Sequence, residues 1–444
     1  MQSRAYIRWI VCLGAVLTAA PASPQVTLPQ VELPNLPIVQ APIDVNRTVN
    51  GVLGAANPER LRELRRLRIR DLLRTNRALL EADPRGAPII RSEVVALSPT
   101  PAALEQARAA GFEIARTRTL DGLDASVVVL RAPPRMSTRR ALRELQRADP
   151  DGVYDFNHLY IESGEMVAQP PAAGSPVPSL VPGAALPELA TKARVGLIDG
   201  GVDRSHRVFS HSAIHEHGCE SAVPSEHGTA IASLIAGYAP DFHGAAPGAA
   251  LYVADVYCGA ATGGAVDAVA EAFAWLSREQ VPVVNVSLVG PANRMLEQIV
   301  RLVIARGIIV VAAVGNDGPS APPLYPAAWP GVVAVTAVDA KRRVLLEACR
   351  GPHVAFAAPG ADMPAASTPQ GYASVRGTSF AAPLIAGLLA MELQQPDKAS
   401  ADAAIAALAA QAIDLGAHGR DRTYGNGLVG EALRMPEKLA KATE

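Results

Sequence analysis

The sequence predicts an α/β protein in which helices cover both faces of a parallel β-sheet, preceded by a smaller α+β domain. After residue 190, near-continuous apolar runs of strand length alternate with helical stretches; the runs are RVGLID, ALYVADVY, VPVVNVSLV, GIIVVAAVG and GVVAVTAVD. Strands that are buried on both faces have this character, which is typical of parallel sheets. Between residues 92 and 160, shorter strand and helix patterns alternate in a different order.

Composition limits the partners that can be expected. Hydrophobic residues make up 49% of the 444 residues and aromatic residues only 4%, so the core must consist mainly of Val, Leu, Ile and Ala. The formal net charge is -1, which gives no general electrostatic reason to expect a nucleic-acid partner.

The N-terminus has the layout of a secretory signal peptide over residues 1–22. Arg4 and Arg8 precede an apolar run, and the small-residue triplet Ala20-Pro21-Ala22 follows it. The alternative is an N-terminal membrane anchor, but the apolar run is short for a bilayer span. We therefore expect an exported protein, periplasmic or secreted, without stable membrane insertion after signal cleavage.

Export places the cysteines in an oxidising compartment. Cys12 leaves with the signal peptide, and Cys219, Cys258 and Cys349 remain. We expect a Cys219–Cys258 disulfide and a buried thiol at Cys349, although spacing alone does not establish a pairing.

Residues 23–91 are expected to form a Pro-rich linker over 24–56 and a basic helix over 57–82. Asn57 can cap the helix, and Pro58 suits its first turn. Such a helix could touch an anionic surface, but a solvated face with an apolar stripe is the favoured interpretation.

Residues 92–160 follow the order β-α-β-β-α-β, the split βαβ pattern of ferredoxin-like domains. Residues 161–190 are rich in Pro, Ala and Ser and are expected to form an exposed linker, and 191–435 form the large domain.

Four polar residues stand beyond the ends of apolar strands or at helix starts. Asp199 follows the strand VGLI, Asn316 follows GIIVVAA, His227 opens a helix away from its buried stripe, and Ser379 is expected at the exposed start of the last helix. A serine becomes nucleophilic when a histidine removes its proton and a buried carboxylate orients that histidine. An Asn side chain and a backbone N–H at a helix start can stabilise the resulting oxyanion.

The stretches VGLIDGGVD, HGTAIASLIAG, VAAVGNDG and GTSFAAPLIAG resemble the signature segments of subtilisin-like serine proteases, the subtilases. The resemblance covers residues 190–435 and implies a doubly wound fold and endopeptidase activity. It implies Ser379 as nucleophile, His227 as general base, Asp199 as its orienting carboxylate and Asn316 as oxyanion donor. No cofactor is implied, and no usual calcium loop is found, which leaves calcium unsupported rather than excluded.

The resemblance also implies polypeptide substrates and an N-terminal propeptide that assists folding and blocks the cleft; residues 92–160 look like that module. The substrate-binding residues it implies are Ser287, Leu288, Val289, Gly315 and Leu324. Val289 and Leu324 stand where glycine is common, which favours a shallow pocket for small or modest apolar side chains. Gly200 stands where Ser or Thr is usual, so one hydrogen bond near Asp199 is expected to be lost.

Three alternatives remain open. The stretch HSAIHEHGCE offers His211, His215, His217 and Cys219 as metal ligands, but without a well-known spacing, and no metal is expected. The triad could serve an esterase or amidase, because acyl transfer does not itself demand a peptide. The fold could also be a catalytically inactive binding module, although every catalytic position is filled.

Overall fold

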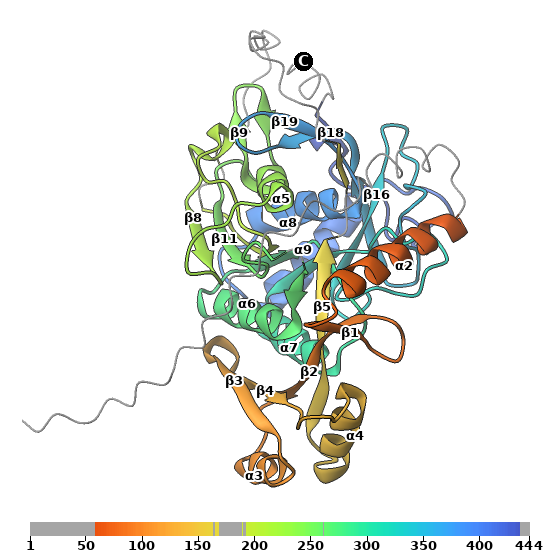
Figure 1. The fold of residues 1–444 in the computed structure, drawn as a ribbon. Helices are drawn as coiled ribbons and strands as arrows, with labels where there is room; N and C mark the ends of the chain where they lie inside the picture. Colours follow the sequence, from red (N-terminus) through yellow and green to blue (C-terminus); the bar gives the residue numbers. More distant parts are fainter. Residues whose placement is uncertain (1–57, 163–164, 168–188, 190–191, 261, 436–444) are drawn as a thin grey trace, which may run out of the picture. The chain divides into compact units, whose positions relative to one another are not determined.

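The computed structural model describes residues 58–162, 165–167, 189, 192–260 and 262–435 (Figure 1). The expected signal peptide, the Pro-rich stretch 24–56, Cys12 and most of the expected linker 161–190 lie outside these residues. Within the described residues, no helix combines the length and apolar character that a membrane crossing requires.

A seven-stranded, wholly parallel sheet forms the centre of the large domain, here called the α/β domain. Its strands, in spatial order, are β17 (Val354–Pro359), β16 (Val333–Val338), β15 (Ile309–Ala313), β13 (Val283–Val286), β7 (Arg194–Asp199), β11 (Ala250–Asp255) and β8 (Ile214–His217). The chain builds outward from β7 in both directions, which makes the sheet doubly wound. Ligands bind at the carboxyl ends of the strands near such a reversal of strand order, and Asp199 ends β7.

Helices cover both faces of this sheet. The helices are α5 (Glu226–Ala236), α6 (Val266–Arg278), α7 (Arg294–Ala305), α8 (Ala382–Met391) and α9 (Lys398–Ala410). Successive residues of a strand face opposite sides, so Val195 and Leu197 join the core under α5 and α8, whereas Ile198 joins the core under α6 and α7. The near-continuous apolar strands are therefore explained by burial on both faces.

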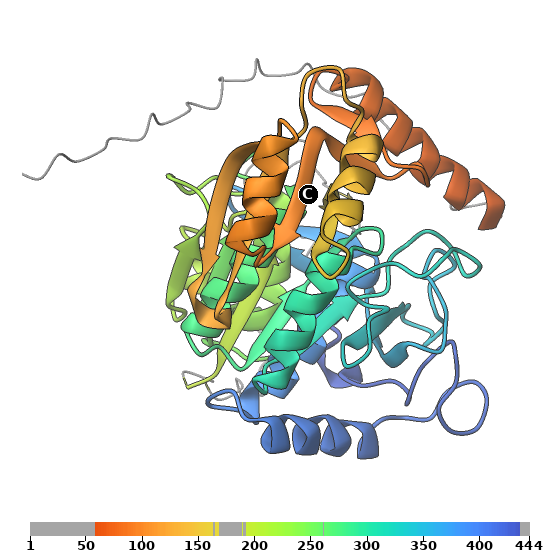
Figure 2. The same ribbon diagram turned by 90° about the horizontal axis from the view of Figure 1, so that it is seen from below.

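The order β-α-β-β-α-β expected for residues 92–160 is present from Pro88 to Glu162, here called the N-terminal module. Its elements are β2 (Pro88–Leu97), α3 (Pro101–Ala109), β3 (Glu113–Leu120), β4 (Ala125–Arg131), α4 (Thr138–Ala148) and β5 (Val153–Glu162). The sheet order β5-β2-β4-β3 is antiparallel throughout. One face of this sheet packs on α3 and α4, and the other joins the core of α6 and α7 (Figure 2).

The basic helix is shorter than the expected 57–82. Helix α2 spans Pro58–Thr75, and the chain then forms β1 (Leu80–Ala82), which pairs with the start of β2. A turn at Asp83 joins the two strands, because its carboxylate accepts hydrogen bonds from the N–H groups of Arg85 and Ala87. The helix is not simply a solvated face, since Arg65 forms an ion pair with Asp317 of the α/β domain (Nε–Oδ2 3.0 Å).

The C-terminal end of strand β5 extends beyond the sheet of the N-terminal module. There it pairs with two short strands of the α/β domain, β12 (Gly264–Ala265) and β14 (Leu288–Val289). Further along, β6 (Glu165–Val167) pairs with β19 (Tyr372–Arg376). The linker prediction for 161–190 is therefore wrong at its N-terminal end, because main-chain pairing orders residues that composition alone assigns to a loop. The remaining elements are β9 (Tyr238–Ala239), β10 (Phe242–His243), β18 (Ala361–Ala366) and the 3₁₀ turns η1 (Asp121–Leu123), η2 (Arg207–Phe209), η3 (Thr378–Phe380) and η4 (Glu431–Leu433).

Candidate active site

Asp199 and His227 form a buried carboxylate–imidazole pair. Nδ1 of His227 lies 2.9 Å from Oδ1 and 3.0 Å from Oδ2 of Asp199. Asp199 is fully buried and His227 is 5% exposed. A carboxylate in this position holds the imidazole with its proton on Nδ1 and stabilises its charged form.

The start of α5 explains why His227 reaches Asp199. Ser225 is the N-cap residue, and its Oγ accepts a hydrogen bond from the N–H of Gly228 at 2.9 Å. The expectation that His227 stands apart from a buried stripe is wrong, because every residue of α5 after Glu226 is buried, His227 included. Because nearly the whole helix is covered, a buried stripe and an exposed face cannot be distinguished on it.

Gly200 occupies the position where the resembled family usually has serine or threonine. Its backbone N–H donates to Oδ1 of Asp199 at 2.8 Å. A Cβ atom at Gly200 would lie 2.4 Å from Oγ of Ser225, so the cap of α5 fills the space that a larger residue would need.

Ser379 lies in η3, packed against the strand segment at Ser287. Oγ of Ser379 donates to the carbonyl of Ser287 at 3.2 Å, and Oγ of Ser287 donates to the carbonyl of Ser379 at 3.0 Å. Asn285 supports this pair by donating from Nδ2 to Oγ of Ser287 at 2.9 Å. Next along the chain, the ring of Phe380 lies 5.6 Å from the ring of His227, which brings η3 beside α5.

The expected exposed position of Ser379 at the start of the last helix is wrong on two points. Ser379 is fully buried in the turn before α8, and α9 follows α8. Pro383 lies in the first turn of α8, which begins at Ala382 rather than near residues 378–380. Ser379 is covered by segments that are distant in sequence, and a local sequence pattern carries no information about such cover.

Asn316 and Gly315 form hydrogen bonds with Thr378, in the same turn η3 that contains Ser379. Oδ1 of Asn316 accepts from the N–H of Thr378 at 3.1 Å, and the N–H of Gly315 donates to Oγ1 of Thr378 at 3.1 Å. Gly315 has φ +95°, and a Cβ atom there would lie 2.4 Å from Cδ1 of Leu324. The structure thus brings Asn316, Gly315 and Leu324 together beside the residue that precedes Ser379.

The strand expected to bind substrate is already occupied by this chain's own β5. Leu288 pairs with Glu162, and Val289 pairs with Ile161, in antiparallel register. The carboxylates of Glu162 and Asp199 and a ring nitrogen of His227 lie within 4.8 Å of one another. Burial alone would lower the pKa of His227, but the charges of Asp199 and Glu162 raise it to about 9.

Sequence reasoning missed Glu162, Asn285, Ser225 and Thr378. Ser225 precedes a helix and could have been found as a cap. Asn285 lies inside an apolar strand, and such a buried polar residue signals a partner. Glu162 carries no local signal, because its position depends on strand pairing with residues far away in the sequence.

The side chains of the histidine-rich stretch do not gather into one group in the structure. The His215 ring stacks on Tyr252 and the His217 ring on Trp275, while His211 contacts Tyr238 edge-on. Cys219 forms the expected disulfide with Cys258, which removes its thiolate as a ligand, and Cys349 is buried as expected.

A doubly wound α/β fold with a buried Asp–His pair beside a serine turn defines a serine hydrolase of the subtilisin-like class. The Subtilase family model matches residues 190–427, more than half of the chain. The chain therefore belongs to the Subtilase family.

Curated relatives match about half of this chain. Subtilisin DY of Bacillus licheniformis is 31% identical over 245 residues, which are 53% of this chain and 88% of that protein. The minor extracellular protease Epr of Bacillus subtilis is 32% identical over 224 residues, which are 49% of this chain but only 34% of that protein. Fervidolysin from Fervidobacterium pennivorans, described as a keratinolytic enzyme related to subtilisin, shares the fold. Its TM-score is 0.63 at 20% identity, covering 78% of this chain and 62% of that structure.

Proposed function

We propose that the chain is an exported serine endopeptidase that hydrolyses peptide bonds through Asp199, His227 and Ser379 and is made as a precursor. The observation that carries the proposal is the buried contact of His227 with Asp199, 2.9 Å from Nδ1 to Oδ1. Nε2 of the same ring is buried and has no hydrogen-bond partner among the described residues. That nitrogen is therefore the one available to exchange a proton with a serine hydroxyl and a leaving amine.

The steps follow from these positions. Nε2 of His227 takes the proton of Ser379 as Oγ attacks the substrate carbonyl, and Asp199 stabilises the imidazolium that forms. The Asn316 side chain and the N–H of Ser379 stabilise the oxyanion of the tetrahedral intermediate. The imidazolium then protonates the leaving amine, and a water molecule activated by the same ring hydrolyses the acyl-enzyme.

The N-terminal module acts as the propeptide in this proposal. Its last strand, β5, takes the main-chain pairing positions on β12 and β14 that a polypeptide substrate would use. Asp199 and, after it, Glu162 raise the pKa of His227 to about 9, which favours the imidazolium near neutral pH, and the contribution of Glu162 is the one that leaves with the module. The precursor is latent for both reasons.

The pairing also indicates where the precursor is cut. Glu162 pairs with β14, which directly follows Ser287, whose carbonyl accepts the hydrogen bond from Ser379. Glu165 pairs with Arg376 of β19, three residues before Ser379. We therefore expect cleavage between Glu162 and Glu165. Val289 and Leu324 favour a small or modest apolar side chain in the residue that precedes the cleaved bond, because they line the pocket proposed to bind it.

Secretion of the full chain and of its Ser379→Ala variant, followed by N-terminal sequencing and assays with casein and a short ester, tests the proposal. We expect the wild-type protein to begin at residue 163, 164 or 165 and to hydrolyse casein, and the variant to do neither. A mature wild-type chain that begins near residue 23 would contradict the removable propeptide. Ester hydrolysis without casein hydrolysis would indicate an esterase, and no hydrolysis at all an inactive binding module.

A further inference from the structure

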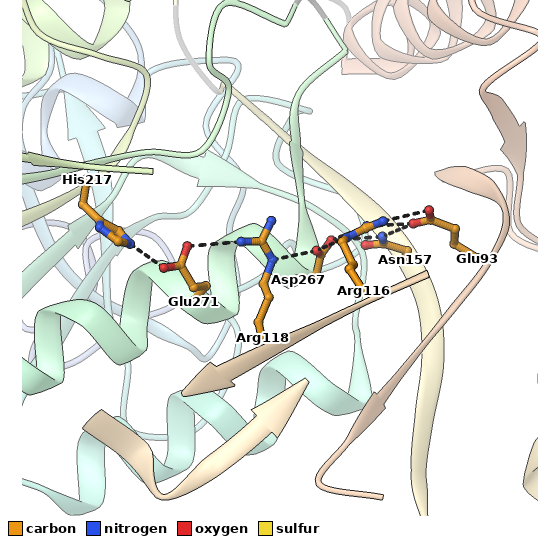
Figure 3. Close-up of polar contacts among 7 residues, drawn as sticks. All are labelled: Glu93, Arg116, Arg118, Asn157, His217, Asp267 and Glu271. Atoms are coloured by element: carbon orange, nitrogen blue, oxygen red, sulfur yellow. Dashed lines mark hydrogen bonds and ion pairs between the residues drawn. The ribbon is translucent and has the colours of Figure 1, made fainter. Parts of the chain in front are cut away.

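A line of charged and polar side chains joins the N-terminal module to the α/β domain, and the proposed mechanism does not use it (Figure 3). The module contributes Glu93, Arg116, Arg118 and Asn157, and the α/β domain contributes Asp267 and Glu271 of α6 and His217 of β8. The line therefore crosses the contact between the two parts.

Asp267 is the centre of this line. Its side chain is 1% exposed, and it accepts from Arg116 (Nε 2.8 Å and Nη2 3.1 Å), from Arg118 (Nε 2.9 Å) and from Asn157 (Nδ2 3.0 Å). All of these donors belong to the N-terminal module. Burial alone would raise the pKa of Asp267, but the two arginines lower it to about 2, so the carboxylate is charged.

The two surfaces match in spacing. Arg116 and Arg118 are two residues apart in β3 and share one face of the strand, about 6.7 Å apart. Asp267 and Glu271 are four residues apart in α6, about 6 Å along one face of the helix. Arg116 is held in place by its own module, since it also donates to Glu93 at 2.9 Å and 2.8 Å.

A simpler explanation is that Asp267 stabilises the first turn of α6, where a carboxylate is favourable in any helix. That explanation leaves Glu271 unaccounted for, because like charges four residues apart destabilise a helix that has no partner. Glu271 interacts with Arg118 at 3.5 Å and with His217, so the module supplies a cation to each carboxylate.

We propose that Asp267 and Glu271 form an arginine-recognition site by which the α/β domain keeps its own N-terminal module bound after the chain between them has been cut. This inference rests on the proposed role of the module as a propeptide. When the module leaves, Asp267 loses the donors Arg116, Arg118 and Asn157, and Glu271 keeps only His217 of its own domain. As long as this ionic contact holds, β5 continues to block the substrate-pairing positions. The charge of Glu162 likewise continues to raise the pKa of His227.

The test uses the full chain with Ser379→Ala, so that its outcome does not depend on catalysis. A recognition sequence for a site-specific protease replaces part of residues 168–188, the chain is cut there, and gel filtration measures the dissociation constant of the two fragments. We expect the fragments to co-elute, and Asp267→Arg to weaken their binding at least about thirtyfold, because it leaves two half-buried arginines facing a cation. The double variant Asp267→Arg, Arg116→Asp should recover at least tenfold of that loss.

Asp402→Arg is the matched control. Asp402 pairs with Lys398 within α9, and the same change of charge there should leave fragment binding unchanged. If Asp267→Arg fails to fold, Asp267→Asn and Glu271→Gln should weaken binding in the same direction and make it less sensitive to salt. Wild-type affinity in these variants, or no recovery in the double variant, would overturn the proposal. A wild-type chain without proteolytic activity would contradict the protease assignment. The fragment-binding measurement would still be valid, because it does not depend on catalysis.

Discussion

Nδ1 of His227 contacts both carboxylate oxygens of Asp199, at 2.9 Å and 3.0 Å, across 28 residues of sequence. The carboxylate ends strand β7, an interior strand of the parallel sheet, and the imidazole lies in the first turn of α5. The N–H of Gly200 donates to the same carboxylate, so its orientation is set from two directions.

Asp199→Asn should lower the turnover number on a peptide substrate by roughly 10⁴-fold, as the loss of this carboxylate does in other serine proteases. The amide can donate to Nδ1 and so favours the wrong tautomer of His227, and it cannot stabilise the imidazolium. Steady-state kinetics of the processed enzyme measure the effect. An unchanged turnover number in a folded variant would exclude Asp199 from catalysis.

Glu162→Gln should lower the pKa of His227 in the Ser379→Ala precursor. A pKa raised from 6.5 to about 9 means that the intact precursor favours the imidazolium. The stability this gives is fully present below about pH 6.5 and is lost as pH rises through 9. Urea unfolding at successive pH values should show a smaller loss over this range in Glu162→Gln than in the precursor with Glu162.

The control for this measurement is Glu113→Gln, which removes an exposed carboxylate of the same module. It should leave the pH profile unchanged. NMR titration of the His227 ring gives a direct reading, and an equal pKa in the precursor and in its Glu162→Gln variant would refute the electrostatic role of Glu162.

Gly200→Ser should destabilise the α/β domain by about 1–3 kcal/mol, the usual range for overpacking. The added Cβ would lie 2.4 Å from Oγ of Ser225, so the cap of α5 has to move. Combining it with Ser225→Gly should recover part of the loss, because the conflicting oxygen is removed. Urea unfolding of Ser379→Ala proteins compares the variants, and simple additivity of the two changes would argue against the steric explanation.

Replacing Cys219 and Cys258 by serine should cost about 4 kcal/mol in the free energy of unfolding by the loop-entropy estimate, because the disulfide closes a separation of 39 residues. The same loop leads from β8 toward Ser225 and α5. Chemical unfolding with and without a reductant should reproduce the difference in the wild-type sequence. Equal stability in both conditions would show that the disulfide constrains neither state.

Much of the fold could be predicted because its signals are local. Apolar strands such as VGLI and GIIVVAA, and the alternation over 92–160, depend on residues that are neighbours in sequence. The end of α2 was missed because Leu80–Ala82 becomes a strand only by pairing with Pro88–Ile90. Short strands of this kind have little intrinsic preference and depend on their partners.

The features of the candidate site likewise divide into those with a local sequence signal and those that depend on distant segments. Asp199, His227, Asn316 and Ser379 were found from their positions at strand ends and helix starts and from the resemblance of their segments. The burial of Ser379, the cover over α5 and the position of Glu162 depend on segments that are distant in sequence. The ionic contact of Arg116 with Asp267 spans 151 residues, and neither residue carries a local sign of the other.

The most direct test that Ser379 is a nucleophile activated by His227 is covalent labelling of the processed protein with a fluorophosphonate, followed by mass spectrometry of its peptides. We expect a single modified residue, Ser379, and a labelling rate that falls sharply in His227→Ala. Labelling of another residue, or of Ser379 at the same rate without the imidazole, would contradict it.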